Sequence, residues 1–171
     1  MVRIRKRCSP DSYIFFVFYD IMRLEKKDYG FVGIQLALFI LYLIDVKLLN
    51  IYIHEIINKA GLVVAIIGAL IALIALLQLK TNLSPFPSPK SNTSLIQNGI
   101  YKFIRHPIYT GIILTTFGYG LFVGSFYKII ISIVLYILFI FKSRYEEERL
   151  ELTFLNYKDY KKRSGRFFPK I

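Results

Sequence analysis

Long apolar runs separated by short polar segments dominate the chain. Residues 31–49 and 62–79 are each close to the ~20 residues that a helix needs to cross a bilayer core. A third apolar stretch, residues 108–141, is interrupted near the glycines at 118–120 and again at 124–128. At ~1.5 Å per residue this stretch is long enough for two spans joined by a tight turn near 124–128. The pattern predicts an all-α integral membrane bundle of four transmembrane helices followed by a C-terminal helical tail.

The segment 12–24 is apolar and aromatic but only thirteen residues long. This length favours a helix that lies in the membrane interface over a fifth span, which would move residues 1–11 across the bilayer. The chain then divides into three parts. They are a basic N-terminal segment with the interfacial helix (1–30), a transmembrane hairpin scaffold (31–79) and a C-terminal half (80–171) that carries the candidate chemistry.

Basic residues are concentrated in three regions. The formal net charge is +12, and of the 23 Lys and Arg residues seven lie in 1–30, four in 80–107 and nine in 142–171. With four spans all three regions fall on one side of the membrane, as the positive-inside rule expects for cytoplasmic termini. The charge then reflects topology and attraction to anionic headgroups, and no nucleic-acid partner is expected. We predict a multi-pass protein whose active site faces the cytoplasm.

Small residues recur in the second apolar run, at Gly61, Ala65, Gly68, Ala69, Ala72 and Ala75. Their spacing lets helices approach closely in a membrane. We interpret residues 31–79 as a scaffold on this basis. The same small faces would permit a dimer, so a monomer and a homodimer both stay open.

Residues 80–98 have prolines at alternate positions, Pro85, Pro87 and Pro89, among Ser, Thr and Asn. Such a segment can be neither a helix nor a paired strand, and it cannot face lipid. It is either a plain linker or a loop that lines a pocket, because it leads directly into residues 99–106.

Few residues suit metal or nucleophilic chemistry. Cys8 is the only cysteine, and the two histidines, His54 and His106, fall on opposite sides of the predicted bundle, so no metal site is expected. No serine or cysteine lies in a nucleophile elbow, and neither GxGxxG nor GxxxxGK occurs. What remains is the electrostatic positioning of a small polar cofactor against a lipid-soluble substrate.

The segment 99–111, GIYKFIRHPIYTG, gathers four polar or aromatic side chains around Pro107: Tyr101, Arg105, His106 and Tyr109. Pro107 disfavours helical backbone at His106 and suits the first position of the helix that follows. The N–H groups and the positive dipole end of that helix then face the same pocket as Arg105 and His106. This arrangement predicts a corner that holds an anion at the membrane surface.

Three consecutive acids follow the last apolar run: Glu146, Glu147 and Glu148. The C-terminal end of a helix favours cations, so these acids need partners. Lys142 and Arg144 could each form an i, i+4 pair with them, worth only ~0.2–0.5 kcal/mol. The alternative is that the acids and the Arg-His-Pro corner share one pocket on the same membrane face. Its mixed charge would suit a zwitterionic ligand with an amino and a carboxylate end.

Four pieces of this sequence together resemble the isoprenylcysteine carboxyl methyltransferase and phospholipid methyltransferase superfamily, integral membrane enzymes that use S-adenosylmethionine. The pieces are LSPFP (83–87), the segment 95–111, the acidic block, and the tail with YKDYKKR (157–163) and RFFP (166–169). The likeness covers about residues 80–170 and rests on the order and spacing of the pieces.

The resemblance implies roles at the matching positions. The cofactor pocket would be lined by Ser94, Leu95, Ile96, Tyr101, His106, Pro107 and Tyr109. A glutamate of the acidic block would also contact S-adenosylmethionine, and a basic residue four positions before it would face the substrate. Two registers are open, Lys142 with Glu146 and Arg144 with Glu148. The second is preferred, because a guanidinium binds a carboxylate through two hydrogen bonds.

One departure concerns the tail, where the family's Phe-Gly-x-x-Tyr reads Phe154-Leu-Asn-Tyr157 and leaves the orientation of the tail open. The implied function is methyl transfer to a lipid-soluble acceptor, with a carboxylate such as that of an isoprenylated cysteine preferred. An amino phospholipid or a thiol stays open as acceptor. The alternatives are a membrane reductase of the sterol-reductase type that uses NADPH, and a non-catalytic membrane scaffold.

Overall fold

A computed structural model describes residues 26–44, 46, 51–79 and 95–170 of the chain. The predicted interfacial helix at 12–24, the three prolines of the connector and Ser94 lie outside these residues. The described elements are α2 (Lys26–Leu43), α3 (Glu55–Leu79), the 3-10 helix η3 (Gly99–Lys102), α4 (Pro107–Phe122), α5 (Phe126–Thr153) and α6 (Tyr157–Arg163).

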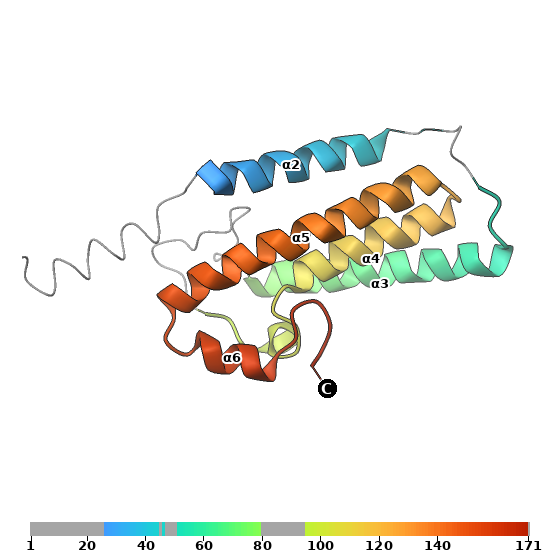
Figure 1. The fold of residues 1–171 in the computed structure, drawn as a ribbon. Coiled ribbons are helices and arrows are strands. Elements are labelled where there is room, and N and C mark those ends of the chain that lie inside the picture. The colour runs from blue at the N-terminus through green and yellow to red at the C-terminus, as the bar shows by residue number, and fades with distance from the viewer. Residues whose placement is uncertain (1–25, 45, 47–50, 80–94, 171) are drawn as a thin grey trace, which may run out of the picture.

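The described part of the chain is helical, as predicted, and its single β-bridge pairs Ile104 with Gly165. Helices α2, α3, α4 and α5 run side by side as an elongated bundle, and α6 and η3 lie at one end of it (Figure 1). Helices α3 and α5 are long and apolar enough to cross a membrane, and α4 is a shorter apolar helix of 16 residues. The count of four spans stays a prediction.

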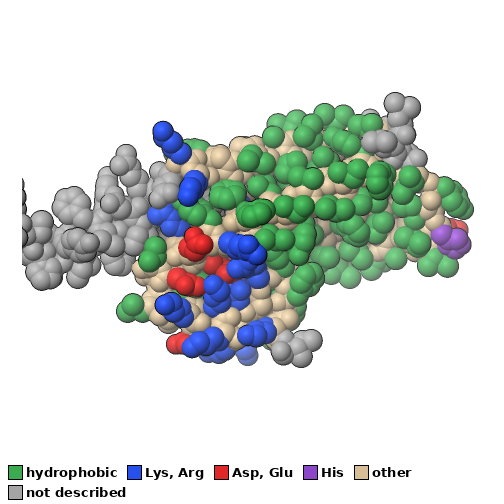
Figure 2. Space-filling model, viewed as in Figure 1, with side chains coloured by type: hydrophobic (Ala, Val, Ile, Leu, Met, Phe, Trp, Pro, Cys, Tyr) green, Lys and Arg blue, Asp and Glu red, His purple; other side chains and the backbone are tan. Residues whose placement is uncertain are grey.

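The outer surface of the bundle is apolar. Large hydrophobic side chains are exposed along α2, α3 and α5, for example Ile40 (64% exposed), Leu77 (64%) and Phe141 (56%). Figure 2 shows hydrophobic side chains over the bundle and most of the charged side chains at the end that carries α6. This division is typical of a lipid-facing bundle with one charged, water-facing cap.

Helices α3 and α4 pack through glycines on both sides of their interface. A Cβ atom added at Gly68 would lie 2.6 Å from the backbone nitrogen of Thr115, and one at Gly111 would lie 2.6 Å from that of Ala72. Gly61 and Gly118 form a second contact of this kind. Gly61, Ala65 and Gly68 therefore pack against α4 of the same chain, whereas Ala69 is exposed, so a monomer and a homodimer both stay open.

The turn between α4 and α5 lies at residues 123–125, at the start of the predicted 124–128 segment. Gly124 has a φ of +64°, and its carbonyl accepts a hydrogen bond from the Ile51 N–H at 2.7 Å. Lys128, placed in the turn by the sequence pattern, is instead a buried residue of α5. Its Nζ donates to the carbonyl oxygen of Tyr42, near the end of α2, at 2.8 Å.

The packing around the glycines predicts that alanine substitutions at two of them change the free energy of unfolding in opposite directions. Gly111→Ala inserts a methyl group into the close contact between α3 and α4 and should lower the free energy of unfolding by about 1–3 kcal/mol. Gly33→Ala in α2, where nothing lies within 4 Å of the added Cβ, should raise it by about 0.5–1 kcal/mol because alanine favours the helix. Thermal unfolding in detergent measures both. Equal shifts of the same sign would contradict this packing.

Candidate functional site

The Arg-His-Pro corner is joined to the end of α3 by two hydrogen bonds. Gly99 adopts a φ of +60°, and the next N–H, of Ile100, donates to Gln78 Oε1 at 3.0 Å. The Tyr101 hydroxyl donates to the Ala75 carbonyl at 3.3 Å. Pro107 is the first residue of α4, and His106 before it has non-helical backbone (φ −122°, ψ 59°), as the His-Pro step predicts.

The C-terminal tail lies along this corner. The Arg105 N–H donates to the Gly165 carbonyl at 2.9 Å, and the His106 N–H donates to the Arg166 carbonyl at 3.1 Å. The Thr110 hydroxyl donates to the Phe167 carbonyl at 2.8 Å. These bonds settle the orientation of the tail, which the shortened Phe154–Tyr157 spacing left open.

Glu147 lies at the centre of the corner. Its carboxylate, 1% exposed, accepts from Arg105 Nε at 2.9 Å, from His106 Nε2 at 3.2 Å and from Arg166 Nη2 at 2.7 Å, and Lys161 Nζ lies 3.4 Å away. A carboxylate so buried is stable as an ion only with this many partners. The sequence predicts that this corner holds the anion of a ligand, whereas in the described structure Arg105 and His106 contact the protein's own Glu147.

Glu146, its neighbour, faces a different environment. Its side chain is 26% exposed, accepts a hydrogen bond from the Tyr109 hydroxyl at 3.1 Å and lies 3.5 Å from His106 Nδ1. His106 therefore sits between the two glutamates, with one ring nitrogen toward each. The His106 ring stacks on Tyr109 (5.5 Å between centroids), which stacks in turn on Phe139 (4.5 Å). This aromatic stack fixes the two polar groups that reach Glu146.

A pocket of about 250 Å³ opens beside this stack. It is lined by residues of α2, α3, η3, α4 and α5: Gln35, Leu79, Tyr101, Arg105, His106, Pro107, Ile108, Tyr109, Ile112, Lys142 and Glu146. The basic corner and the acidic block are thus brought to one cavity. Glu146 is the member of the acidic block that lines it.

Lys142 contributes a buried cation to this pocket, besides Arg105. Its side chain is 1% exposed, its Nζ donates to Gln35 Oε1 at 2.7 Å, and it lies 5.5 Å from the centre of the Tyr109 ring. Gln35 comes from α2 and was missed by reasoning from the sequence, which treated residues 31–79 as scaffold. The available signal was a polar amide within an otherwise apolar run.

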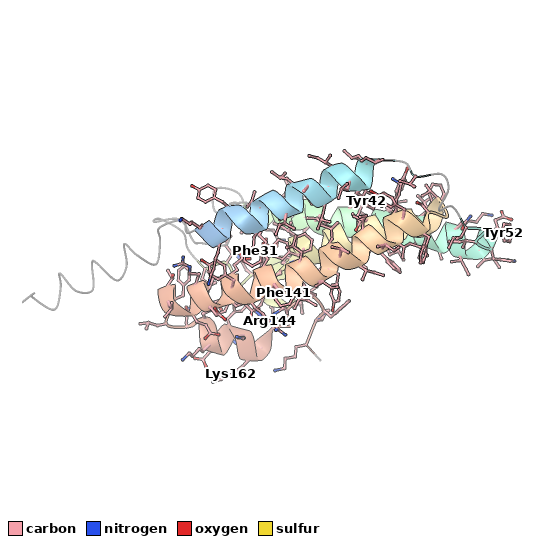
Figure 3. All side chains as sticks on the ribbon, turned by 45° about the horizontal axis from the view of Figure 1, so that its top comes forward. Phe31, Tyr42, Tyr52, Phe141, Arg144 and Lys162 are labelled. Atoms are coloured by element: carbon pink, nitrogen blue, oxygen red, sulfur yellow. The ribbon has the colours of Figure 1, made fainter. Side chains whose placement is uncertain are left out.

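Arg144 and Glu148, the preferred pair from the sequence, are both exposed and do not line the pocket. Figure 3 labels Arg144 on the charged half of α5. The reason is helical geometry: at about 100° per residue, positions two apart point to opposite sides of the helix. The structure therefore brings the Lys142 and Glu146 register to the cavity. Leu95 and Ile96 are half-buried and lie outside the pocket lining.

Two buried tyrosines, Tyr101 of η3 and Tyr160 of α6, join these two helices. Burial raises the pKa of Tyr160 to about 12, and burial together with the charge of Glu146 raises the pKa of Tyr101. Both phenols are therefore protonated donors at neutral pH. The Tyr160 hydroxyl donates to the Tyr101 carbonyl at 2.5 Å, which joins α6 to η3.

Comparisons with known proteins identify the family. The sequence matches the phospholipid methyltransferase family over residues 56–156, more than half of the chain. The fold is similar to that of a eukaryotic intramembrane Ras methyltransferase, isoprenylcysteine carboxyl methyltransferase, with a TM-score of 0.62 and 21% sequence identity. That similarity covers 97% of this chain and 58% of the other, so this chain spans little more than half the length of that enzyme. No curated protein matches the sequence. The superfamily resemblance seen in the sequence is confirmed, and the chain belongs to the phospholipid methyltransferase family of membrane proteins.

Proposed function

We propose that the protein transfers a methyl group from S-adenosylmethionine to a lipid-soluble acceptor, most simply a carboxylate such as that of an isoprenylated cysteine. The family match supports methyl transfer and does not favour a reductase. The observation that carries the proposal is the pocket itself. A partly exposed carboxylate, Glu146, and a buried ammonium, Lys142, line one cavity where the charged cap meets the apolar bundle.

The residues of the pocket fit the charge of the cofactor. When bound, S-adenosylmethionine supplies a methyl group already activated by a sulfonium, and it also carries an ammonium and a carboxylate. Glu146 is the acid that can pair with the sulfonium or the ammonium of the cofactor, because its side chain is 26% exposed. Glu147 is instead enclosed by Arg105, His106 and Arg166. The Tyr101 and Tyr109 rings border the same cavity.

The acceptor is proposed to approach from the apolar side of this cavity. A second hollow, of about 410 Å³, lies among α2, α3 and α4 and is lined largely by apolar side chains, among them Phe39, Leu73 and Leu76. Ile112 borders both hollows. An acceptor with an anionic end and a hydrocarbon body would match this pair. Attack by a carboxylate oxygen would form the new O–CH3 bond as the S–CH3 bond breaks and S-adenosylhomocysteine leaves, and it would need no general base. It would require the oxygen ~3–3.5 Å from the methyl carbon, in line and shielded from water.

The remaining assignments are also part of the proposal. Lys142 takes the substrate-facing role first given to Arg144, and Arg105 with Glu147 holds the corner rather than the ligand. Ser94, Leu95 and Ile96 stay proposed cofactor contacts on the family resemblance alone. The charged cap with α6 is proposed to face the cytoplasm in a multi-pass chain.

Glu146→Gln tests which acid serves the cofactor. Loss of a charge-assisted contact should weaken S-adenosylmethionine binding by roughly tenfold or more, measured by calorimetric titration without acceptor. Glu148→Gln is the matched control, because Glu148 is exposed and outside the pocket, and its affinity should equal that of the unmodified protein. Unchanged binding in Glu146→Gln would overturn this site.

Glu147→Gln should act on stability instead. The substitution leaves the guanidinium groups of Arg105 and Arg166 beside a neutral amide in a buried site, and should cost roughly 3 kcal/mol of unfolding free energy or more. Thermal unfolding in detergent would show the loss as a lower Tm. A Tm equal to that of the unmodified protein would mean that this ion cluster does not hold the tail.

A ligand comparison separates the proposed activity from its alternatives. S-adenosylhomocysteine should raise the Tm of the purified protein, since a ligand that binds only the folded state stabilises it, whereas NADPH should leave it unchanged. Methyl-labelled cofactor with host lipid extract would then reveal the acceptor. Stabilisation by NADPH alone would favour a reductase, and no effect of either ligand would favour a scaffold.

A further inference from the structure

We propose that Gln35 of α2 contacts the acceptor directly, and that it acts together with Lys142 of α5 to bind the acceptor's carboxylate at two points. The inference rests on the proposed methyl transfer and assigns a role to a helix outside the matched family region, which begins at residue 56.

The first step is the environment of Lys142. Its ammonium is almost wholly enclosed, and a charge in that position is stable only with acceptors and opposite charges around it. Gln35 Oε1 accepts its hydrogen bond at 2.7 Å, the Tyr109 ring lies beside it, and the acids that act on its charge are Glu146 and Asp28. The ammonium is thus oriented by groups from three helices.

The second step is the orientation of α2. Phe31, Gln35, Leu38 and Tyr42 lie on the inward side of this helix, whereas Ile34 and Leu36 are more than half exposed. Phe31 and Tyr42 are labelled in Figure 3.

The far end of α2 is fixed by two hydrogen bonds, from the Tyr42 hydroxyl to the Thr116 carbonyl at 2.6 Å and from Lys128 Nζ to the Tyr42 carbonyl. These bonds fix the rotation of α2 about its axis. These contacts hold α2 in the rotation that turns Gln35 toward the pocket.

The third step is the chemistry of recognition. An ammonium is a point charge and does not by itself fix the plane of a carboxylate, whereas a guanidinium does so through two parallel hydrogen bonds. An amide whose oxygen is held by Lys142 carries its two N–H donors on the same rigid group. Gln35 and Lys142 together can therefore donate to the two oxygens of one carboxylate. One helical turn further along α2, Phe39 lines the apolar hollow that would take the hydrocarbon body.

The test uses the full chain in detergent, with methyl-labelled S-adenosylmethionine and N-acetyl-S-farnesylcysteine as the acceptor probe. Gln35→Met keeps the length of the side chain and removes the amide. It should raise KM for the acceptor about tenfold, the usual loss for one hydrogen bond to a charged group, and leave KM for S-adenosylmethionine unchanged. Ile34→Met, on the exposed side of α2, is the matched control and should change neither value. An unchanged acceptor KM in Gln35→Met would overturn the inference.

A double substitution distinguishes recognition from packing. Lys142→Arg supplies two-point binding from one side chain, so Gln35→Met should raise KM for the acceptor less than twofold when it is combined with Lys142→Arg. An equal rise in both backgrounds would show a merely structural role for Gln35.

Equilibrium binding of the same probe and of its carboxamide, without cofactor, separates the two levels of the proposal. The unmodified protein should prefer the carboxylate over the carboxamide by tenfold or more, and Gln35→Met should reduce that preference severalfold while Lys142 keeps a part of it. Preference without methyl transfer would overturn the proposed function and keep this inference. Transfer with no effect of Gln35→Met would overturn this inference alone, and neither preference nor transfer would overturn both.

Discussion

The buried carboxylate of Glu147 is the interaction on which the rest of the charged cap depends. It joins the end of α5 to Arg105 before α4 and to Arg166 in the C-terminal tail, three segments far apart along the chain. Removing an ion from water is costly, so a carboxylate in this position is stable only when cations and hydrogen-bond donors surround it. The same side-chain pairs lie beside the backbone hydrogen bonds between residues 103–106 and residues 165–166, so both kinds of contact hold these two segments together.

The adjacent Glu146 has a different role because of the helix that carries both acids. Consecutive residues point about 100° apart on an α-helix, so Glu147 faces the tail while Glu146 faces the cavity beside Tyr109 and His106. The same geometry brings Lys142, one turn earlier, to the cavity and leaves Arg144 outside it. One acid thus supports the fold and its neighbour is available to a ligand.

The apolar bundle is held together by the close approach of the α3 and α4 backbones. In lipid, apolar surface gains little by leaving one apolar environment for another, so shape decides helix contacts. The opposed glycines of α3 and α4 meet this requirement, and they place the start of α4 next to the end of α3, where the pocket opens. Helix α2 adds Gln35 to that opening and Phe39 to the apolar hollow, so it forms a wall common to both.

Local features of the sequence determined the helical class, the start of α4 at Pro107 and the family, and they offered a shared pocket for the basic corner and the acidic block as one of two alternatives. Each depends on periodicity, proline stereochemistry or motif spacing, which are properties of neighbouring residues. Only the tertiary structure decided that Lys142 rather than Arg144 faces the cavity and that Gln35 lines it. It also decided that the glycines of α3 pack against α4. These depend on how one helix is rotated against another, and only contacts between segments distant in the chain set that rotation.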